Sequence, residues 1–96
     1  MRIALGSDHA GYEMKAVVAG YLSAVKTDFE DFGSRPGEVA DYVDHAAAAC
    51  RAVLEGTCDR AILFCGTGIG MAMAANKFPG IRATVCWSRE TAEVSR

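Results

Sequence analysis

A continuous apolar run, Ala61–Phe64, leads directly into the glycine-rich segment Cys65–Gly70. Apolar residues in unbroken succession are typical of a central strand in a parallel sheet, because both faces of such a strand are covered. The glycines that follow predict a tight turn, and the small residues after them predict a helix that ends near Lys77. Since this strand needs cover on both faces, the rest of the chain is expected to supply helices on both sides of a sheet.

Strand-like and helix-like segments alternate along the rest of the chain. Short apolar runs predict strands, and apolar residues at helical spacing predict helices. The predicted strands are Ile3–Gly6, an edge strand over 27–32, Ala61–Phe64 and Ile81–Trp87. The predicted helices cover roughly 11–25, the stripe from Val43 to Leu54, the small-residue segment after Gly70, and a capped start at Ser88–Thr91. This order implies right-handed βαβ crossovers, and so a single α/β, Rossmann-like domain over residues 1–96 with four parallel strands.

The first predicted helix is amphipathic. Its apolar residues recur at helical spacing and form one stripe, made of Met14, Val17, Val18, Tyr21, Leu22 and Val25. The charged residues Glu13, Lys15 and Lys26 fall off that stripe. This pattern predicts an amphipathic helix over roughly residues 11–25.

Charge and cysteine content exclude several classes of protein. Twelve acidic against ten basic side chains give a net charge of −2, so the chain has no global positive field for nucleic acid or an anionic membrane. The four cysteines lack the close spacing of metal sites and of secreted disulfide frameworks, which predicts reduced thiols, no metal and a cytoplasmic location. No stretch of the sequence is long and apolar enough to span a bilayer. At 96 residues, the domain is expected to need an oligomeric partner for stability.

Two loops should meet where chemistry is expected, beyond the carboxyl ends of the strands. The first, Gly6–Gly11, places the carboxylate of Asp8 beside the imidazole of His9. The second, Cys65–Gly70, places a thiol at the start of a glycine-rich nest of amides that suits an anion. This second loop lacks the Lys-Ser/Thr ending of a Walker loop and the GxGxxG spacing of a dinucleotide fingerprint, so nucleotide binding is a minority interpretation.

A thiol beside anion-stabilising amides suits proton abstraction next to a carbonyl, because amides and a helix dipole favour a thiolate. Aldose–ketose isomerisation needs such a base and donors for an enediolate oxygen. We therefore expect Cys65 to be the base, and Asp8 and His9 to bind the sugar. The enediolate is expected to lie against the Thr67 hydroxyl and the amides of Gly66, Gly68, Ile69 and Gly70. The residues alone leave simpler roles open, with Asp8 as a helix cap and His9 as a surface turn residue.

These motifs together resemble the ribose-5-phosphate isomerase B and galactose-6-phosphate isomerase family. The matching segments span the chain, and they are Gly6–Gly11, Asp41–Asp44, Cys65–Met71, Ala74–Lys77 and Pro79–Ala83. The resemblance implies a three-layer α/β/α fold with five strands in the family and an enediol mechanism without metal or cofactor. It also implies a sugar-phosphate substrate of pentose phosphate metabolism, and a homodimer, or a dimer of dimers, whose active sites are shared between subunits.

The sequence departs from the family pattern in two places. Val43 stands where the family usually has a proline, which should affect only a helix start. The family also continues beyond the segment near Ser88 with a His-Asn-Asp motif, a further strand and a terminal helix carrying arginines. In the family that histidine opens the sugar ring and those arginines bind the phosphate. The chain is therefore expected to correspond to the amino-terminal two-thirds of such an enzyme.

Other functions stay open from the sequence. A phosphate- or nucleotide-binding module would need only the loop amides, and an inactive subunit of a heteromeric isomerase would rely on a longer partner. The remaining cysteines are assigned no role: Cys50 and Cys86 lie on apolar stripes and are expected in the core, whereas Cys58 lies in a turn. His45, on a helix beside acidic residues, is expected to be solvated.

Overall fold

The computed structural model describes residues 1–33 and 42–95. Residues 34–41, which include most of the predicted loop after Gly33 and the Asp41 of one family motif, lie outside the described part. In chain order, the elements are β1 (Arg2–Ser7), α1 (Tyr12–Ala24), β2 (Asp28–Asp31), α2 (Tyr42–Leu54), β3 (Arg60–Phe64), α3 (Ile69–Ala75) and α4 (Arg89–Val94). Most of these bounds lie within a few residues of those expected from the sequence.

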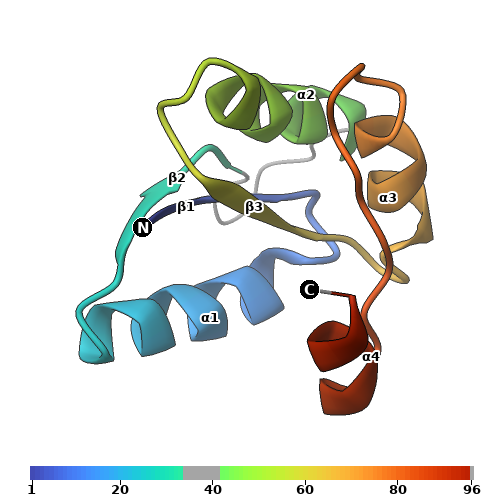
Figure 1. Ribbon diagram of the computed structural model, residues 1–96. Coiled ribbons are helices and arrows are strands. Elements are labelled where there is room, and N and C mark those ends of the chain that lie inside the picture. Colours follow the sequence, from blue (N-terminus) through green and yellow to red (C-terminus); the bar gives the residue numbers. More distant parts are fainter. Residues whose placement is uncertain (34–41, 96) are drawn as a thin grey trace.

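The described strands form one parallel sheet in the order β2-β1-β3. Helix α1 covers one face of the sheet and α2 the other, with α3 beside α2 (Figure 1). The predicted three-layer α/β/α architecture is therefore confirmed. Because β1 lies in the centre, the loops that follow β2 and β3 lie on either side of the loop that follows β1.

The core between the sheet and α2 is built largely from small side chains. One buried cluster joins β1 to α2 through Ala4, Ala49, Ala52 and Cys58, and a second joins α2 to α3 through Ala46, Met71 and Ala74. Because alanine side chains are small, the backbone of α2 can approach the strands closely. Cys50 is buried, as predicted. Cys86 is exposed, so its predicted place in the core is wrong.

The predicted fourth strand, Ile81–Trp87, is not part of the sheet. The segment runs extended past α3 towards α4 (Figure 1). Within this segment, Ala83 donates its N–H to Asn76 Oδ1 at 2.8 Å, and its carbonyl accepts from Asn76 Nδ2 at 2.8 Å. The side chain of Asn76 thus takes both backbone groups that a strand neighbour would need. The helix start predicted at Ser88 is confirmed, since Ser88 and Thr91 form a capping box at the beginning of α4.

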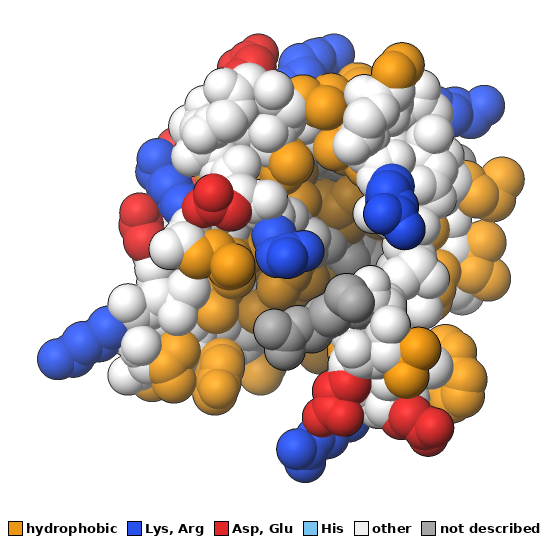
Figure 2. Space-filling model, in the orientation of Figure 1, with side chains coloured by type: hydrophobic (Ala, Val, Ile, Leu, Met, Phe, Trp, Pro, Cys, Tyr) orange, Lys and Arg blue, Asp and Glu red, His pale blue; other side chains and the backbone are white. Residues whose placement is uncertain are grey.

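Helix α1 lies where the sequence predicts a helix, but it packs on the sheet mainly through residues outside its apolar stripe. Leu22 and Lys15 are buried, whereas Met14, Val17 and Tyr21 are 61–69% exposed. The buried face is displaced by about one residue, roughly 100° around the helix. Space-filling Figure 2 shows the apolar side chains gathered along the lower edge, where α1 lies. Lys15, which falls off the stripe, turns inward and pairs with Asp31 on β2.

Candidate active site

The two predicted site loops lie side by side at the carboxyl edge of the sheet. The parallel register of β1 and β3 places Ser7 opposite Phe64. The next residues in each chain segment are therefore Asp8 and Cys65, and the Asp8 N–H donates to the Phe64 carbonyl at 3.1 Å. The fold thus brings together the carboxylate loop and the thiol loop, as the strand order predicts.

Close backbone contact holds these loops together at Gly11. A Cβ atom at this position would lie 2.5 Å from both the carbonyl carbon and the carbonyl oxygen of Phe64. Real Cβ atoms essentially never approach other atoms this closely, so only glycine fits without a shift. Gly66 lies nearby, with 3.9 Å between its ideal Cβ position and the Cβ of Ala10. The loops that carry Asp8 and Cys65 are therefore packed backbone against backbone.

The thiol of Cys65 is half-buried and accepts a hydrogen bond within its own loop. The Gly68 N–H donates to Cys65 Sγ at 3.0 Å. Gly68 has φ +83°, a left-handed conformation that glycine adopts at little cost, and this conformation points the N–H back at the sulfur. An N–H aimed at sulfur complements negative charge there. The loop therefore directs one backbone donor at the sulfur.

Thr67 is exposed, and its Oγ1 accepts from the Ile69 N–H at 3.1 Å. Since that contact uses an oxygen lone pair, the hydroxyl hydrogen can still be donated to a ligand. The sequence analysis placed the amides of Gly66, Gly68, Ile69 and Gly70 around an anion. In the structure the Gly68 and Ile69 amides point at side chains of their own loop. Anion binding by the Gly66 and Gly70 amides stays a prediction.

Asp8 and His9 occupy the entrance to α1. The Asp8 Oδ1 accepts from the Gly11 N–H at 2.9 Å. The N-cap residue of α1 is Gly11 and no side chain caps it, so Asp8 holds the turn before the helix and is not its cap. His9 is exposed beside it. The structure thus places both residues next to the thiol loop, and their contacts with a sugar stay predictions.

Two features of this edge were missed in the sequence. His45 was expected in solvent, but it is half-buried: its Nδ1 lies 3.1 Å from the Phe32 carbonyl oxygen, and its ring packs against Gly33. Lys15 was expected on the polar face of its helix, yet it is 2% exposed and paired with Asp31. For His45, the glycine at position 33 was the one sequence signal of a tight contact. For Lys15 there was no signal, because no pattern distinguishes it from a surface lysine.

Other kinds of site find no support in residues 1–33 and 42–95. In that part of the chain, no group of three or more His, Cys, Asp or Glu side chains is placed to hold a metal ion. No helix there is long and apolar enough to cross a membrane. The chemistry of the edge therefore has to be argued from Cys65, Thr67, Asp8, His9 and backbone amides.

Comparison with known proteins identifies the family. Residues 3–96 match the family model described as Ribose/Galactose Isomerase. The chain belongs to the ribose/galactose isomerase family. It is 41% identical over 95 residues to ribose-5-phosphate isomerase B of Escherichia coli (strain K12), and 38% identical over 97 residues to 4-deoxy-4-sulfo-D-erythrose isomerase of Clostridium sp. (strain MSTE9).

Solved structures agree with this assignment. The ribose-5-phosphate isomerase B of Clostridium thermocellum superposes with a TM-score of 0.97 at 46% identity, and that of Thermotoga maritima with 0.96 at 41% identity. These matches cover 99–100% of this chain and 65–66% of the two solved chains. The chain likewise spans 64% of the Escherichia coli protein and 61% of the Clostridium sp. protein. The fold predicted from the resemblance is confirmed, over about two-thirds of the relatives' length.

Proposed function

We propose that this chain carries the base and the sugar-binding loops of an aldose–ketose isomerase that interconverts ribose 5-phosphate and ribulose 5-phosphate. The observation that supports it best is the Cys65 thiol, half-buried, facing the Gly68 N–H and packed beside the Asp8–His9 loop. The names of the relatives point to the same reaction class, with two of the matched enzymes acting as ribose-5-phosphate isomerases B.

In the proposed reaction, the Cys65 thiolate takes the proton from C2 of the open-chain aldose. The C2 electron pair forms the C1–C2 double bond, and the former C1 carbonyl oxygen becomes the enediolate oxygen. The Thr67 hydroxyl and the loop amides stabilise that oxygen. The thiol then returns the proton to C1, and the C2 hydroxyl passes its proton to the C1 oxygen as the ketone forms at C2 and the hydroxyl at C1. Asp8 and His9 bind sugar hydroxyls or the phosphate. No metal or cofactor takes part in this proposal.

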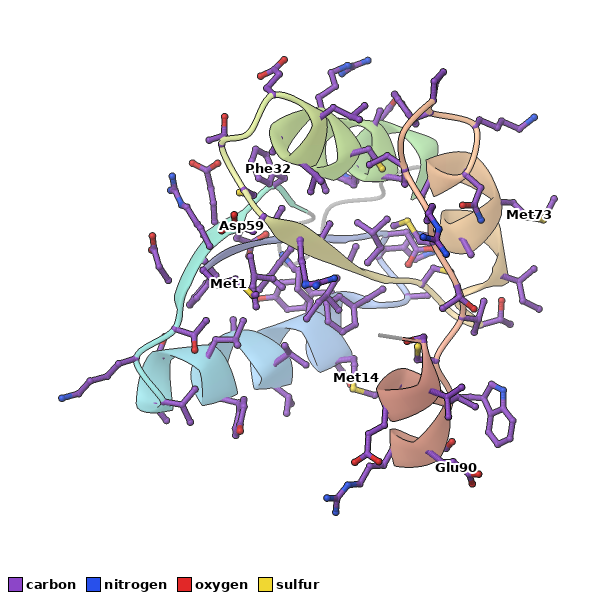
Figure 3. The ribbon with its side chains drawn as sticks, viewed as in Figure 1. Met1, Met14, Phe32, Asp59, Met73 and Glu90 are labelled. Carbon is purple, nitrogen blue, oxygen red and sulfur yellow. The ribbon has the colours of Figure 1, made fainter. Side chains whose placement is uncertain are left out.

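A shared active site in a homodimer, or in a dimer of dimers, belongs to the same proposal. The exposed apolar side chains of α3 support it, since Ile69 is 56% and Met73 63% exposed. Met73 projects outward from α3 (Figure 3), the helix that follows the loop of Cys65. A second subunit on this face would cover both side chains and lie at the edge of the site. We place the enzyme in cytoplasmic pentose phosphate metabolism, in keeping with four free cysteines.

Proton NMR of ribose 5-phosphate in deuterated buffer tests the proposal. The wild-type chain should exchange the C2 hydrogen for deuterium, and Cys65→Ala should slow this exchange by about 10²–10⁴-fold, as expected for loss of a general base. Cys86→Ala is the matched control, because it removes an exposed thiol outside the site and should leave the rate unchanged. Equal exchange by Cys65→Ala and the wild type would show that Cys65 is not the base.

A second candidate is a sugar-phosphate-binding subunit without turnover of its own, because binding would need the loop amides and not the Cys65 thiol. In that case the wild-type chain would bind ribose 5-phosphate, seen as shifts of the Gly66 and Thr67 amide resonances, without any C2 exchange. Exchange that appears only after mixing with a longer homologous chain would assign it to a heteromer.

A further inference from the structure

Lys15 is the largest fully buried side chain among the described residues, at 2% exposure. A buried ammonium is costly unless it is paired and hydrogen-bonded. Its Nζ lies 2.7 Å from each carboxylate oxygen of Asp31, and 5.3 Å from the centre of the Tyr12 ring. Such a contact ties α1 to the last residue of β2, at the same edge of the sheet as the thiol loop.

The carboxylate of Asp31 links the Lys15 ammonium to the backbone after β2. Its Oδ1 also accepts from the Gly33 N–H at 2.8 Å, which fixes the turn that follows β2. Gly33 has φ +115°, and a Cβ there would lie 2.5 Å from the His45 ring, so the turn requires glycine in this conformation. In that conformation the Gly33 carbonyl faces β1.

The Gly33 carbonyl accepts from the Ser7 N–H at 2.7 Å. Ser7 is fully buried and is followed by Asp8, whose own N–H donates to Phe64 on the other side. A continuous path of contacts therefore runs from the Lys15 ammonium through Asp31 and Gly33 to the start of the Asp8–His9 loop. Packing of apolar side chains alone would not require a charged residue at the start of this path.

We propose that Lys15 and Asp31 are positioning residues that set the Asp8–His9 loop for sugar binding. The pair does so by fixing the Gly33 carbonyl against Ser7, and it does not touch the substrate. The part that concerns binding rests on the proposed function, and the part that concerns the Gly33–Ser7 contact does not. Each part therefore has its own measurement.

The first measurement is amide hydrogen exchange by NMR, which needs no substrate. In Lys15→Met, which keeps a long apolar side chain but removes the charge, the Gly33 and Ser7 amides should exchange about tenfold faster or more, as expected for losing hydrogen bonds to a charged group. Lys15→Arg keeps the charge and should retain most of the protection. Leu22→Ala is the matched control, because it removes a buried side chain from the same helix without touching the pair.

The second measurement is the kinetics of C2 deuterium exchange with ribose 5-phosphate. Loss of positioning in Lys15→Met should raise KM by about tenfold while kcat and the rate of Cys65 alkylation by iodoacetamide stay near the wild-type values. Leu22→Ala should lower the thermal midpoint without this rise in KM. If Lys15→Met does not fold, Asp31→Asn tests the same contact, since it keeps the lysine and one side-chain oxygen.

Two results would overturn the proposal. Protection of Gly33 and Ser7 that is unchanged in Lys15→Met, or lost equally in Leu22→Ala, would give the pair a merely structural role. Faster exchange of these amides with an unchanged KM would remove the link to binding. A wild-type chain without C2 exchange would refute the proposed function, while the amide measurement would still decide whether the pair holds the loop.

Discussion

Replacing Gly11 by alanine should separate the two loops of the candidate site. The backbone of Gly11, with φ −92° and ψ 0°, lies in the bridge region, which non-glycine residues populate sparsely but without the penalty of a positive φ. The conflict is steric. The new Cβ would lie 2.5 Å from the Phe64 carbonyl, whereas real Cβ atoms essentially never come closer than 3.0 Å to another atom. The backbones of Gly11 and Phe64 would therefore have to move apart by about 0.5 Å.

The magnitude follows from what has to move. Phe64 is the last residue of β3, so its backbone cannot yield without disturbing the strand or the start of α1. Overpacking of this kind costs about 1–3 kcal/mol. For a domain of this size, each kcal/mol corresponds to a fall of roughly 4–8 °C in the thermal midpoint. Because the Asp8 N–H donates to the same Phe64 carbonyl, the substitution should also move Asp8 away from Cys65.

Gly20→Ala provides the matched control. Gly20 lies in the middle of α1, and a Cβ there would meet nothing within 4 Å. Alanine should therefore stabilise the chain by about 0.5–1 kcal/mol, since glycine loses more conformational entropy in a helix. The same substitution is thus expected to lower the free energy of unfolding at Gly11 and to raise it at Gly20. Urea unfolding of both variants, with the rate of Cys65 alkylation as a readout of the site, makes the comparison. A Gly11→Ala variant as stable as Gly20→Ala would refute the close approach of the loops.

Three further predictions concern other parts of the fold. Burial raises the pKa of the Cys50 and Cys58 thiols, so their contribution to stability is fully present below pH 9 and should be lost as the pH rises through the raised values. In urea unfolding, the free energy of unfolding should fall less between pH 7 and pH 10 when both cysteines are replaced by alanine. Asn76→Ala should cost about 1–2 kcal/mol and expose the Ala83 amide to fast hydrogen exchange, because two hydrogen bonds are lost; unchanged exchange would contradict this role. Ser88→Ala should cost about 1 kcal/mol and fray α4, as seen in the amide exchange of that helix; a helix protected as before would rule out the cap.

The elements that the sequence predicts well are those fixed by local patterns. The apolar run at Ala61–Phe64 predicts β3 with nearly the observed bounds. The prediction that this strand is central is wrong for the described sheet, where β1 is central and β3 lies at an edge. The capping residues at Ser88 mark the start of α4 for a similarly local reason. Parallel register then brings the loops after β1 and β3 together, so the pairing of Asp8 with the Cys65 loop could also be predicted.

The errors arise where a single side chain from another segment decides the outcome. Apolar residues cover most of α1, so periodicity alone allows more than one buried face. The position of Asp31 at the end of β2 selects the face that carries Lys15. In the same way, the side chain of Asn76 takes the hydrogen-bonding groups of Ala83 and keeps Ile81–Trp87 out of the sheet. Neither partner can be recognised from spacing along the chain.

The position of Asp8 depends on both neighbouring strands at once. On one side, the Ser7 N–H donates to the Gly33 carbonyl beyond β2, and on the other, the Asp8 N–H donates to the Phe64 carbonyl at the end of β3. These bonds join backbone groups, so they leave no signature in residue types except the glycines that permit them. The loop of Asp8 is therefore held by two constraints, an ion pair behind Gly33 and a close backbone approach at Gly11. These constraints meet in the first turn of α1, because the Lys15 N–H donates to the Gly11 carbonyl at 3.0 Å. The effects of Lys15→Met and Gly11→Ala on the free energy of unfolding should therefore couple rather than add, and a double-mutant cycle measures the coupling.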